Sequence, residues 1–133
     1  MTVGYSGTPL PKKLEIKDGT RVATVGAPRD FASMLGTLPA GARVQPGLRA
    51  PRDLTIWFVT SRRQLEGDLR RVIPPPGQGS LWVAWPKKAS GMKTDVTEDA
   101  LREVILPLGL VDRKVCAIDA TWSGLLFSWR RKS

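Results

Sequence analysis

The stretch 53–73 reads DLTIWFVTSRRQLEGDLRRVI and contains both kinds of secondary structure on which the fold prediction rests. Its first part, 53–60, is a nearly continuous apolar run, which is typical of a β-strand covered on both faces. Ser61 then forms a capping-box pattern with Gln64, and apolar residues recur after it at the spacing of one helical face. The stretch therefore predicts a buried strand that leads directly into an amphipathic helix.

The same order of strand and helix recurs on either side of this stretch. Further strands are expected at 21–27, 42–45, 81–85, 111–118 and 125–130. Helices are expected at 10–14, at 29–36 and between Thr97 and Gly109. Because each crossover between parallel strands lays a helix against the sheet, we predict an α/β, Rossmann-like fold with a mainly parallel sheet flanked by helices. The last two strands should form a C-terminal antiparallel pair at the sheet edge, in a single domain spanning 1–133.

Two further contact types are expected at and along the helices. Thr97 is a favourable N-cap, and Val96 and Leu101 are placed to form a hydrophobic staple around it. Glu66 and Arg70 are four residues apart in the order that favours a surface ion pair on a helix. These contacts would stabilise the two longer helices on the sheet.

The composition excludes several kinds of catalytic chemistry. The chain has no histidine and a single cysteine, Cys116. It therefore lacks Ser-His-Asp and Cys-His nucleophile pairs, imidazole proton transfer and histidine zinc sites, and one thiolate cannot hold a metal. We predict no metal site and no catalytic residue of these types. Cys116 lies in the middle of an expected strand, where cysteine is usually a small core residue.

The charge balance favours anionic partners. The chain has 21 lysines and arginines against 12 acidic residues, a formal net charge of +9. Such a surface attracts nucleotides, nucleic acid or acidic partners without choosing among them. The first residues contain no apolar segment of signal-peptide length, and the longest apolar run is too short to cross a bilayer. We therefore expect a cytoplasmic protein without a membrane partner.

Basic residues follow three apolar strands, at the point where each strand ends. They occur in GAPRD after Val25, in TSRR after Val59 and in WPKK after Ala84. Ligands of open parallel sheets bind in the crevice at the carboxyl ends of the strands, so we expect the three exits to form a ligand-binding crevice. The predicted ligand-binding residues are Arg29, Thr60, Ser61, Arg62, Arg63, Lys87, Lys88 and Ser90.

The position of the arginines suggests an anion, but a second interpretation stays open. A cation in a first helical turn opposes the helix macrodipole at a cost of roughly 0.3 to 1 kcal/mol. An anion bound at the start of the helix would reverse that cost, because backbone N–H groups and side-chain cations would converge on it. In the alternative, the basic side chains point into water and pair with nearby acids, namely Asp30, Glu66, Asp95 and Glu98.

A nucleotide cofactor receives little support from the motifs. Gly26 follows the first strand, but no second glycine completes a dinucleotide-binding pattern, and the region 42–47 has no acid that would hold a ribose. We therefore predict no cofactor. Among the five tryptophans, Trp122 lies in the expected turn DATWSG and is the best candidate for an exposed aromatic that stacks on a base or partner, although core packing is the favoured interpretation.

Several motifs together resemble a known family. The segments GYSGTPLPKKLEIKDG, FVTSR, LWVAWPKKASG with TDVTED, and LPLGLVDRKVCAIDATWSGLLF resemble the bacterial family called domain of unknown function 3052. That resemblance implies a small cytoplasmic bacterial protein and no activity. At the level of the fold, the strand order and terminal hairpin also resemble a shortened class I methyltransferase, without the glycine-rich cofactor loop and the acidic ribose contact of that fold.

Three functional hypotheses follow from these observations. The first is a noncatalytic binding module for an anionic ligand or acidic protein partner at the strand exits. The second is a methyltransferase-like enzyme that uses a nucleotide-type cofactor, and the third is a nucleic-acid-binding protein. The sequence does not identify the ligand or the oligomeric state.

Overall fold

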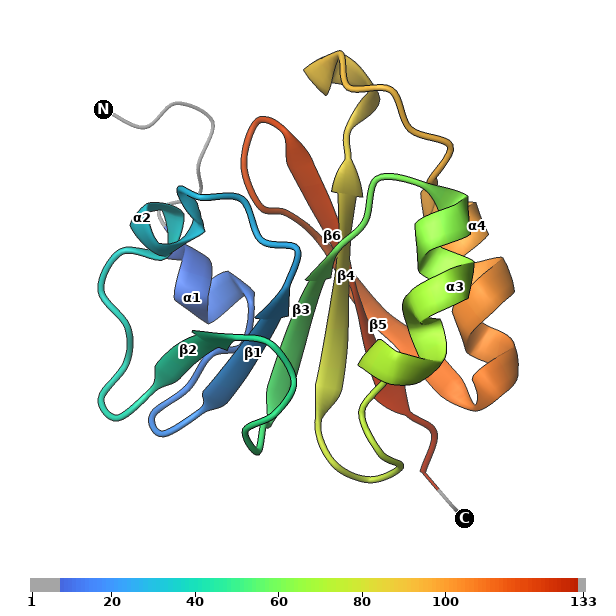
Figure 1. The fold of residues 1–133 in the computed structure, drawn as a ribbon. Helices are drawn as coiled ribbons and strands as arrows, with labels where there is room; N and C mark the ends of the chain where they lie inside the picture. Colours follow the sequence, from blue (N-terminus) through green and yellow to red (C-terminus); the bar gives the residue numbers. More distant parts are fainter. Residues whose placement is uncertain (1–7, 132–133) are drawn as a thin grey trace.

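The computed structural model describes residues 8–131 and contains a six-stranded sheet with the strand order β2-β1-β3-β4-β6-β5 (Figure 1). The first four strands in this order are parallel, whereas β6 is antiparallel to both of its neighbours, β4 and β5. The strands are β1 (Arg21–Val25), β2 (Arg43–Pro46), β3 (Leu54–Phe58), β4 (Ser80–Pro86), β5 (Leu110–Ala117) and β6 (Trp122–Trp129). The predicted Rossmann-like α/β fold with a C-terminal antiparallel pair is therefore confirmed.

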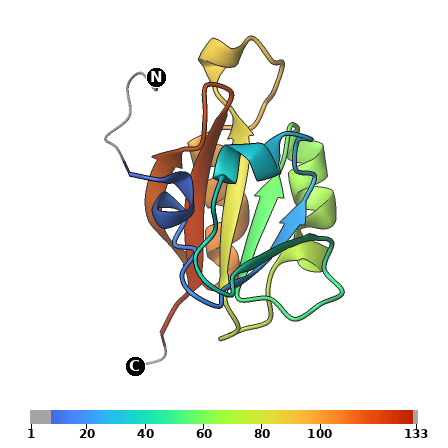
Figure 2. The ribbon, with the colours of Figure 1, turned by 90° about the vertical axis from the view of Figure 1, so that its left-hand side faces the viewer.

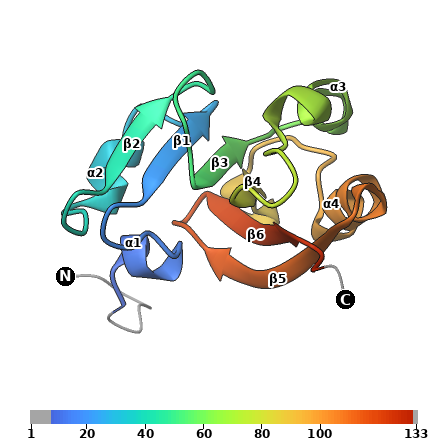
Figure 3. The same ribbon diagram turned by 90° about the horizontal axis from the view of Figure 1, so that it is seen from below.

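The helices cover both faces of the sheet. One face carries α1 (Leu10–Lys13) and α2 (Phe31–Leu35), and the other carries α3 (Arg62–Val72) and α4 (Glu98–Ile105). Figure 2 shows α1 and α2 in front of the sheet, and Figure 3 shows the two pairs on opposite sides of it. Two short 3-10 helices, η1 (Lys88–Ser90) and η2 (Leu106–Leu108), follow β4 and α4.

The core has two halves, one on each face, because side chains alternate along the central strands. All five residues of β3 are buried. Trp57 packs in the cluster that contains the apolar faces of α3 and α4, whereas Ile56 and Phe58 pack in the cluster that contains Phe31 and Leu35 of α2. The unbroken apolar run that the sequence shows in this region is therefore the centre of a sheet covered on both sides.

The capping predictions are confirmed. The Ser61 hydroxyl accepts the backbone N–H of Gln64 at 3.0 Å, and the Gln64 side-chain oxygen accepts the backbone N–H of Thr60 at 3.1 Å. The Thr97 hydroxyl accepts the backbone N–H of Ala100 at 3.0 Å. Both members of the expected staple, Val96 and Leu101, are buried in the same core cluster. Local sequence patterns thus fix where α3 and α4 begin.

Two expectations need correction. Glu66 pairs with Arg62, one turn earlier in α3, so the expected pair with Arg70 is wrong. The last strand begins at Trp122, inside the segment DATWSG (119–124) that was expected to form the turn. The connection from β5 is therefore shorter than predicted. The expected antiparallel pair does lie at one edge of the sheet, with β5 outermost and β6 between β4 and β5. Within 8–131, no helix is long and apolar enough to cross a membrane, and no three metal-ligating side chains gather.

Candidate functional site

The three predicted exits lie at one edge of the sheet. β1, β3 and β4 are parallel neighbours, so their carboxyl ends reach the same edge, which is uppermost in Figure 1. The segment after β4 turns through η1 and projects beyond this edge, as Figures 1 and 2 both show. We call this region the carboxyl edge. It contains all eight residues that the sequence predicts as ligand-binding.

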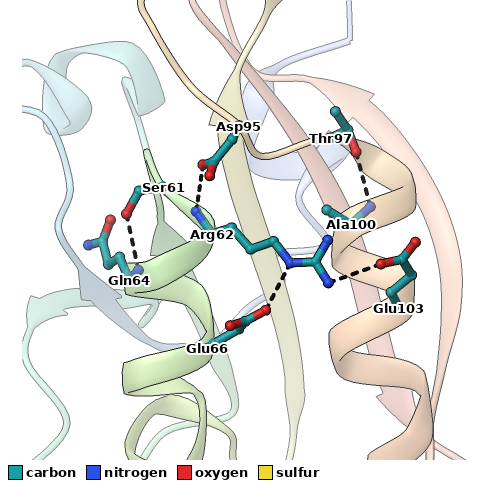
Figure 4. A network of polar contacts seen from close by, with 8 residues as sticks. All are labelled: Ser61, Arg62, Gln64, Glu66, Asp95, Thr97, Ala100 and Glu103. Carbon is teal, nitrogen blue, oxygen red and sulfur yellow. Dashed lines mark hydrogen bonds and ion pairs between the residues drawn. The ribbon is translucent and has the colours of Figure 1, made fainter.

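Arg62 is held by acids of the chain itself. Its Nε donates to the Glu66 carboxylate at 2.8 Å, and its Nη2 donates to the Glu103 carboxylate at 3.0 Å (Figure 4). These hydrogen bonds, first with Glu66 and then with Glu103, raise the pKa of Arg62 above its usual value. The side chain lies along the helix surface and links α3 to α4. For Arg62 the structure therefore shows the pairing that the second interpretation describes.

The start of α3 also receives an internal carboxylate. Asp95, in the segment between η1 and α4, accepts the backbone N–H of Arg62 at 2.7 Å (Figure 4). Ser61 uses its hydroxyl to cap the same helix. An anion does meet the N-terminus of α3, as the macrodipole argument requires, but it belongs to this chain. A ligand at this helix start would have to displace Asp95.

We expect Asp95→Ala to lower the free energy of unfolding by about 1 kcal/mol, because the substitution removes a charged acceptor at a helix N-terminus. Asp30→Ala is the matched control, since Asp30 precedes α2 without a side-chain capping bond and should change stability by less than about 0.5 kcal/mol. Urea unfolding followed by circular dichroism measures both. Equal losses for the two variants would show that the Asp95 contact contributes nothing measurable.

After β4, the side chain of Ser90 forms hydrogen bonds with the backbone. The Ser90 hydroxyl donates to the Lys87 carbonyl at 2.6 Å and accepts the backbone N–H of Met92 at 3.2 Å. The backbone N–H of Lys87 in turn donates to the Thr121 carbonyl at 2.8 Å, which ties this exit to the β5–β6 connection. Ser90 therefore shapes the turn that presents Lys87 and Lys88.

Four of the predicted cations have no acidic partner within 8–131. All four lie at the carboxyl edge, where three are exposed and Lys87 is half-buried: Arg29, Arg63, Lys87 and Lys88. Arg63 differs in this respect from its neighbour Arg62. The carboxyl edge thus keeps an excess of positive charge, although its central arginine is neutralised. Ligand binding by these residues stays a prediction.

Arg29 also lines a cavity, which has a volume of about 510 Å³. The cavity lies between the end of β1, the edge strand β2 and helix α2, and its lining includes Thr24, Phe31, Leu35, Val44 and Pro46. Most of the lining is apolar, Thr24 contributes a hydroxyl, and none of the described lining residues is acidic. Its volume is in the range of small-molecule sites. The sequence did not predict this cavity, because it depends on how α2 lies over the edge strand.

An aromatic row forms the core beside this cavity and corrects the expectation for Trp122. Phe58 makes edge-to-face contacts with Phe31 and with Trp122, each with ring centroids 5.1 Å apart. Trp122 is only 8% exposed and begins β6. The expected exposed aromatic is therefore wrong, and the core-packing interpretation is confirmed. Trp122 fixes the end of β3 against the start of β6 and cannot present its ring to a base without unpacking.

Cys116 does not have the environment of a nucleophile. It is partly buried in β5, and burial raises the pKa of its thiol above the usual value, against the smaller opposite effect of Lys13, Lys114 and Lys87. A thiol with a raised pKa contains less thiolate at neutral pH, and the thiolate is the reactive form. Within 8–131, the hydrogen bond of this thiol goes to the backbone carbonyl of Ala117, at 3.6 Å.

Two sequence comparisons found no match. No family model matches the chain, and no curated protein matches it either. The resemblance to domain of unknown function 3052 is consequently not supported by a match.

Comparison with solved structures does give similar folds. One is a protein in the NADB-Rossmann superfamily from Streptococcus agalactiae. The alignment covers 100% of this chain and 72% of that protein, at 11% identity and a TM-score of 0.57. A SAM-dependent methyltransferase from Aquifex aeolicus matches 87% of the chain with 85% of its own, at 15% identity and a TM-score of 0.55. Fibrillarin from Aeropyrum pernix, in complex with natively bound S-adenosyl-L-methionine, matches 93% with 70% of its own, at 15% identity and a TM-score of 0.55.

These likenesses support the fold and the predicted similarity to class I methyltransferases at the level of architecture. Identities of 11% and 15% are too low to carry an activity from those proteins to this chain.

Proposed function

We propose that the protein is a noncatalytic binding module for an anionic small molecule, which it binds at the carboxyl edge. The observation that carries the proposal is the position of Arg29, an exposed cation without an acidic partner in 8–131 that lines an otherwise mostly apolar cavity of about 510 Å³. Such a cavity suits a ligand with an apolar body and one negative group, because Arg29 can hold the charge while Phe31 and Leu35 contact the body. Lys87 and Lys88 would add attraction from the neighbouring exit.

A methyltransferase-like enzyme is the alternative that the fold likeness favours, and the lining residues fit its cofactor poorly. Adenosylmethionine carries a cationic sulfonium and ribose hydroxyls, which dinucleotide-type sites hold with an acidic side chain. Among the described lining residues, Thr24 has the only side-chain acceptor and Arg29 carries the only charge, which is positive. We therefore derive no methyl-transfer step. The nucleic-acid alternative rests on the net charge of +9 alone.

The test compares ligands by thermal shift and titration calorimetry on wild-type protein and two variants. An aromatic carboxylate such as 2-naphthoate should stabilise the wild type, and Arg29→Ala should weaken its binding by about tenfold, since it removes a charged hydrogen-bond donor. Arg70→Ala is the matched control, because Arg70 is an exposed arginine of α3 without an ion pair in the described residues. This variant removes the same charge and should bind as the wild type does.

Each outcome selects one hypothesis. Equal weakening by Arg29→Ala and Arg70→Ala would contradict the cavity site and indicate nonspecific attraction to the net charge. Stabilisation by adenosylmethionine but not by the aromatic carboxylate would favour the enzyme. A single-stranded oligonucleotide that binds with a steep salt dependence, insensitive to Arg29→Ala, would favour the nucleic-acid hypothesis.

A further inference from the structure

A second concentration of positive charge lies at the opposite edge of the sheet, where the parallel strands begin. We call it the amino edge. The segment before β3 and the segment between α3 and β4 lie side by side there, at the bottom of Figure 1 and facing the viewer in Figure 3. They line a cavity of about 580 Å³, to which Arg21, Arg49, Arg52 and Asp53 contribute. This cavity is separate from the carboxyl edge and plays no part in the proposed function.

Arg52 is the unusual residue of this cavity. It is partly buried, and its Nη2 donates to the carbonyl of Val72, the last residue of α3, at 3.1 Å, while its Nη1 donates to the Leu48 carbonyl at 3.5 Å. Its Nε is buried and has no hydrogen-bond partner among the described residues. A guanidinium has five N–H donors, so the contacts to Val72 and Leu48 leave at least part of the group unsatisfied.

The nearest acid in the sequence does not neutralise Arg52. The carboxylate of Asp53 binds Arg21, with contacts of 3.0 Å from Nε, 2.9 Å from Nη2 and 2.8 Å from the backbone N–H. This pairing lowers the pKa of Asp53 below its usual value. Arg52 is in no ion pair within 8–131, and burial lowers its pKa, which is the response of a cation that lacks an acidic partner. A partly buried charge without a counter-ion is costly to keep.

Arg49 gives the cavity a second uncompensated cation. It is exposed, lines the same cavity and has no ion pair in the described residues. The three arginines of the lining therefore face one aspartate, which is already bound by Arg21. Guanidinium groups are the side chains that proteins use most often to hold oxyanions such as phosphate, because their N–H donors match the spacing of the oxygens.

We propose that the amino-edge cavity binds a phosphate group, either as inorganic phosphate or as the phosphoryl end of a small metabolite, through Arg49 and Arg52. The phosphate oxygens would accept the Nη protons of Arg52 that Leu48 and Val72 do not use, and would give its partly buried charge a counter-ion. In the simpler explanation, Arg52 serves only to cap the carbonyl end of α3 through Val72. Only the ligand explanation involves Arg49. This residue makes no hydrogen bond to α3 within the described residues, so capping of the helix does not need it.

The test is a titration of the full chain with inorganic phosphate at constant ionic strength, followed by the NMR signal of the Arg52 Nε–H. The signal should shift and saturate in the wild type, and Arg49→Ala should raise the dissociation constant by about fivefold or more. Arg49 is exposed, so this variant should keep the fold and its unfolding midpoint. Arg29→Ala, at the carboxyl edge, is the control and should leave the Arg52 titration unchanged.

Three results would overturn the proposal: an Arg52 signal that does not move, one that moves linearly without saturation, or one that saturates identically in Arg49→Ala. Repeating the titration with glycerol 3-phosphate distinguishes the sources of the phosphate group. Tighter binding of the ester would identify a phosphorylated metabolite, and equal binding would identify phosphate itself. Loss of carboxylate binding in Arg29→Ala without any effect on Arg52 would support both proposals at separate sites.

Discussion

Replacing Trp82 by alanine should lower the free energy of unfolding by roughly 4 to 6 kcal/mol, of which about 3 to 5 comes from the lost packing and the cavity. The remainder comes from a lost hydrogen bond. Trp82 is fully buried in β4, and its Nε1 donates to the Leu14 carbonyl at 2.9 Å. Domains of this size typically have a free energy of unfolding of only about 5 to 15 kcal/mol, so a large fraction of the variant molecules should be unfolded at low urea concentrations. Urea unfolding followed by circular dichroism measures the change.

A pair of phenylalanine substitutions separates the two contributions. Trp82→Phe and Trp57→Phe remove similar volumes from fully buried sites in adjacent strands. Only Trp82→Phe leaves a carbonyl, that of Leu14, without its donor, because the Nε1 of Trp57 is buried with no partner among the described residues. We therefore expect Trp82→Phe to cost about 1 to 2 kcal/mol more. Equal losses would mean that the bond to Leu14 contributes no net stability.

The sequence predicted the fold where periodicity is strong and local. The run 53–60 and the capping box at Ser61 placed β3 and α3 almost to the residue. The start of β6 was missed because TWSG has the composition of a turn. Gly124 nevertheless lies in the strand, where an added Cβ would meet the Trp82 ring at 3.1 Å. A side chain there would press on a ring of the neighbouring strand, and no local pattern shows that contact.

The candidate site was predicted as far as topology determines it. The strand exits do gather at one edge, because parallel strands in a Rossmann-like sheet leave no other arrangement. The partners of the side chains could not be predicted in the same way. Glu103, which binds Arg62, is 41 residues away on another helix, and the contact depends on the distance between α3 and α4. The cavity beside Arg29 and the charged amino edge likewise arise from tertiary packing.

Gly79→Ala should be the most damaging substitution that adds only one methyl group. Gly79 has a φ of +96° and directly precedes β4. An added Cβ would lie 2.5 Å from the carbonyl oxygen of Asp53 and 2.9 Å from its carbonyl carbon. These are backbone atoms of the neighbouring segment, so no side-chain rotation can relieve the clash. The Asp53 carbonyl also accepts the backbone N–H of Ser80 at 3.1 Å, and the two segments would have to separate where β3 and β4 begin to pair.

Gly77→Ala isolates the clash from the backbone conformation. Gly77 has a φ of +77°, similar to that of Gly79, but an added Cβ there meets nothing within 4 Å. Its substitution should cost about 1 to 2 kcal/mol, the penalty for a left-handed alanine. Gly79→Ala should cost roughly 2 to 5 kcal/mol, because overpacking adds about 1 to 3 to that penalty. Equal urea midpoints for the two variants would show that the segment moves away from Asp53 freely. A clearly lower midpoint for Gly79→Ala would establish that close backbone contact holds β3 and β4 together there.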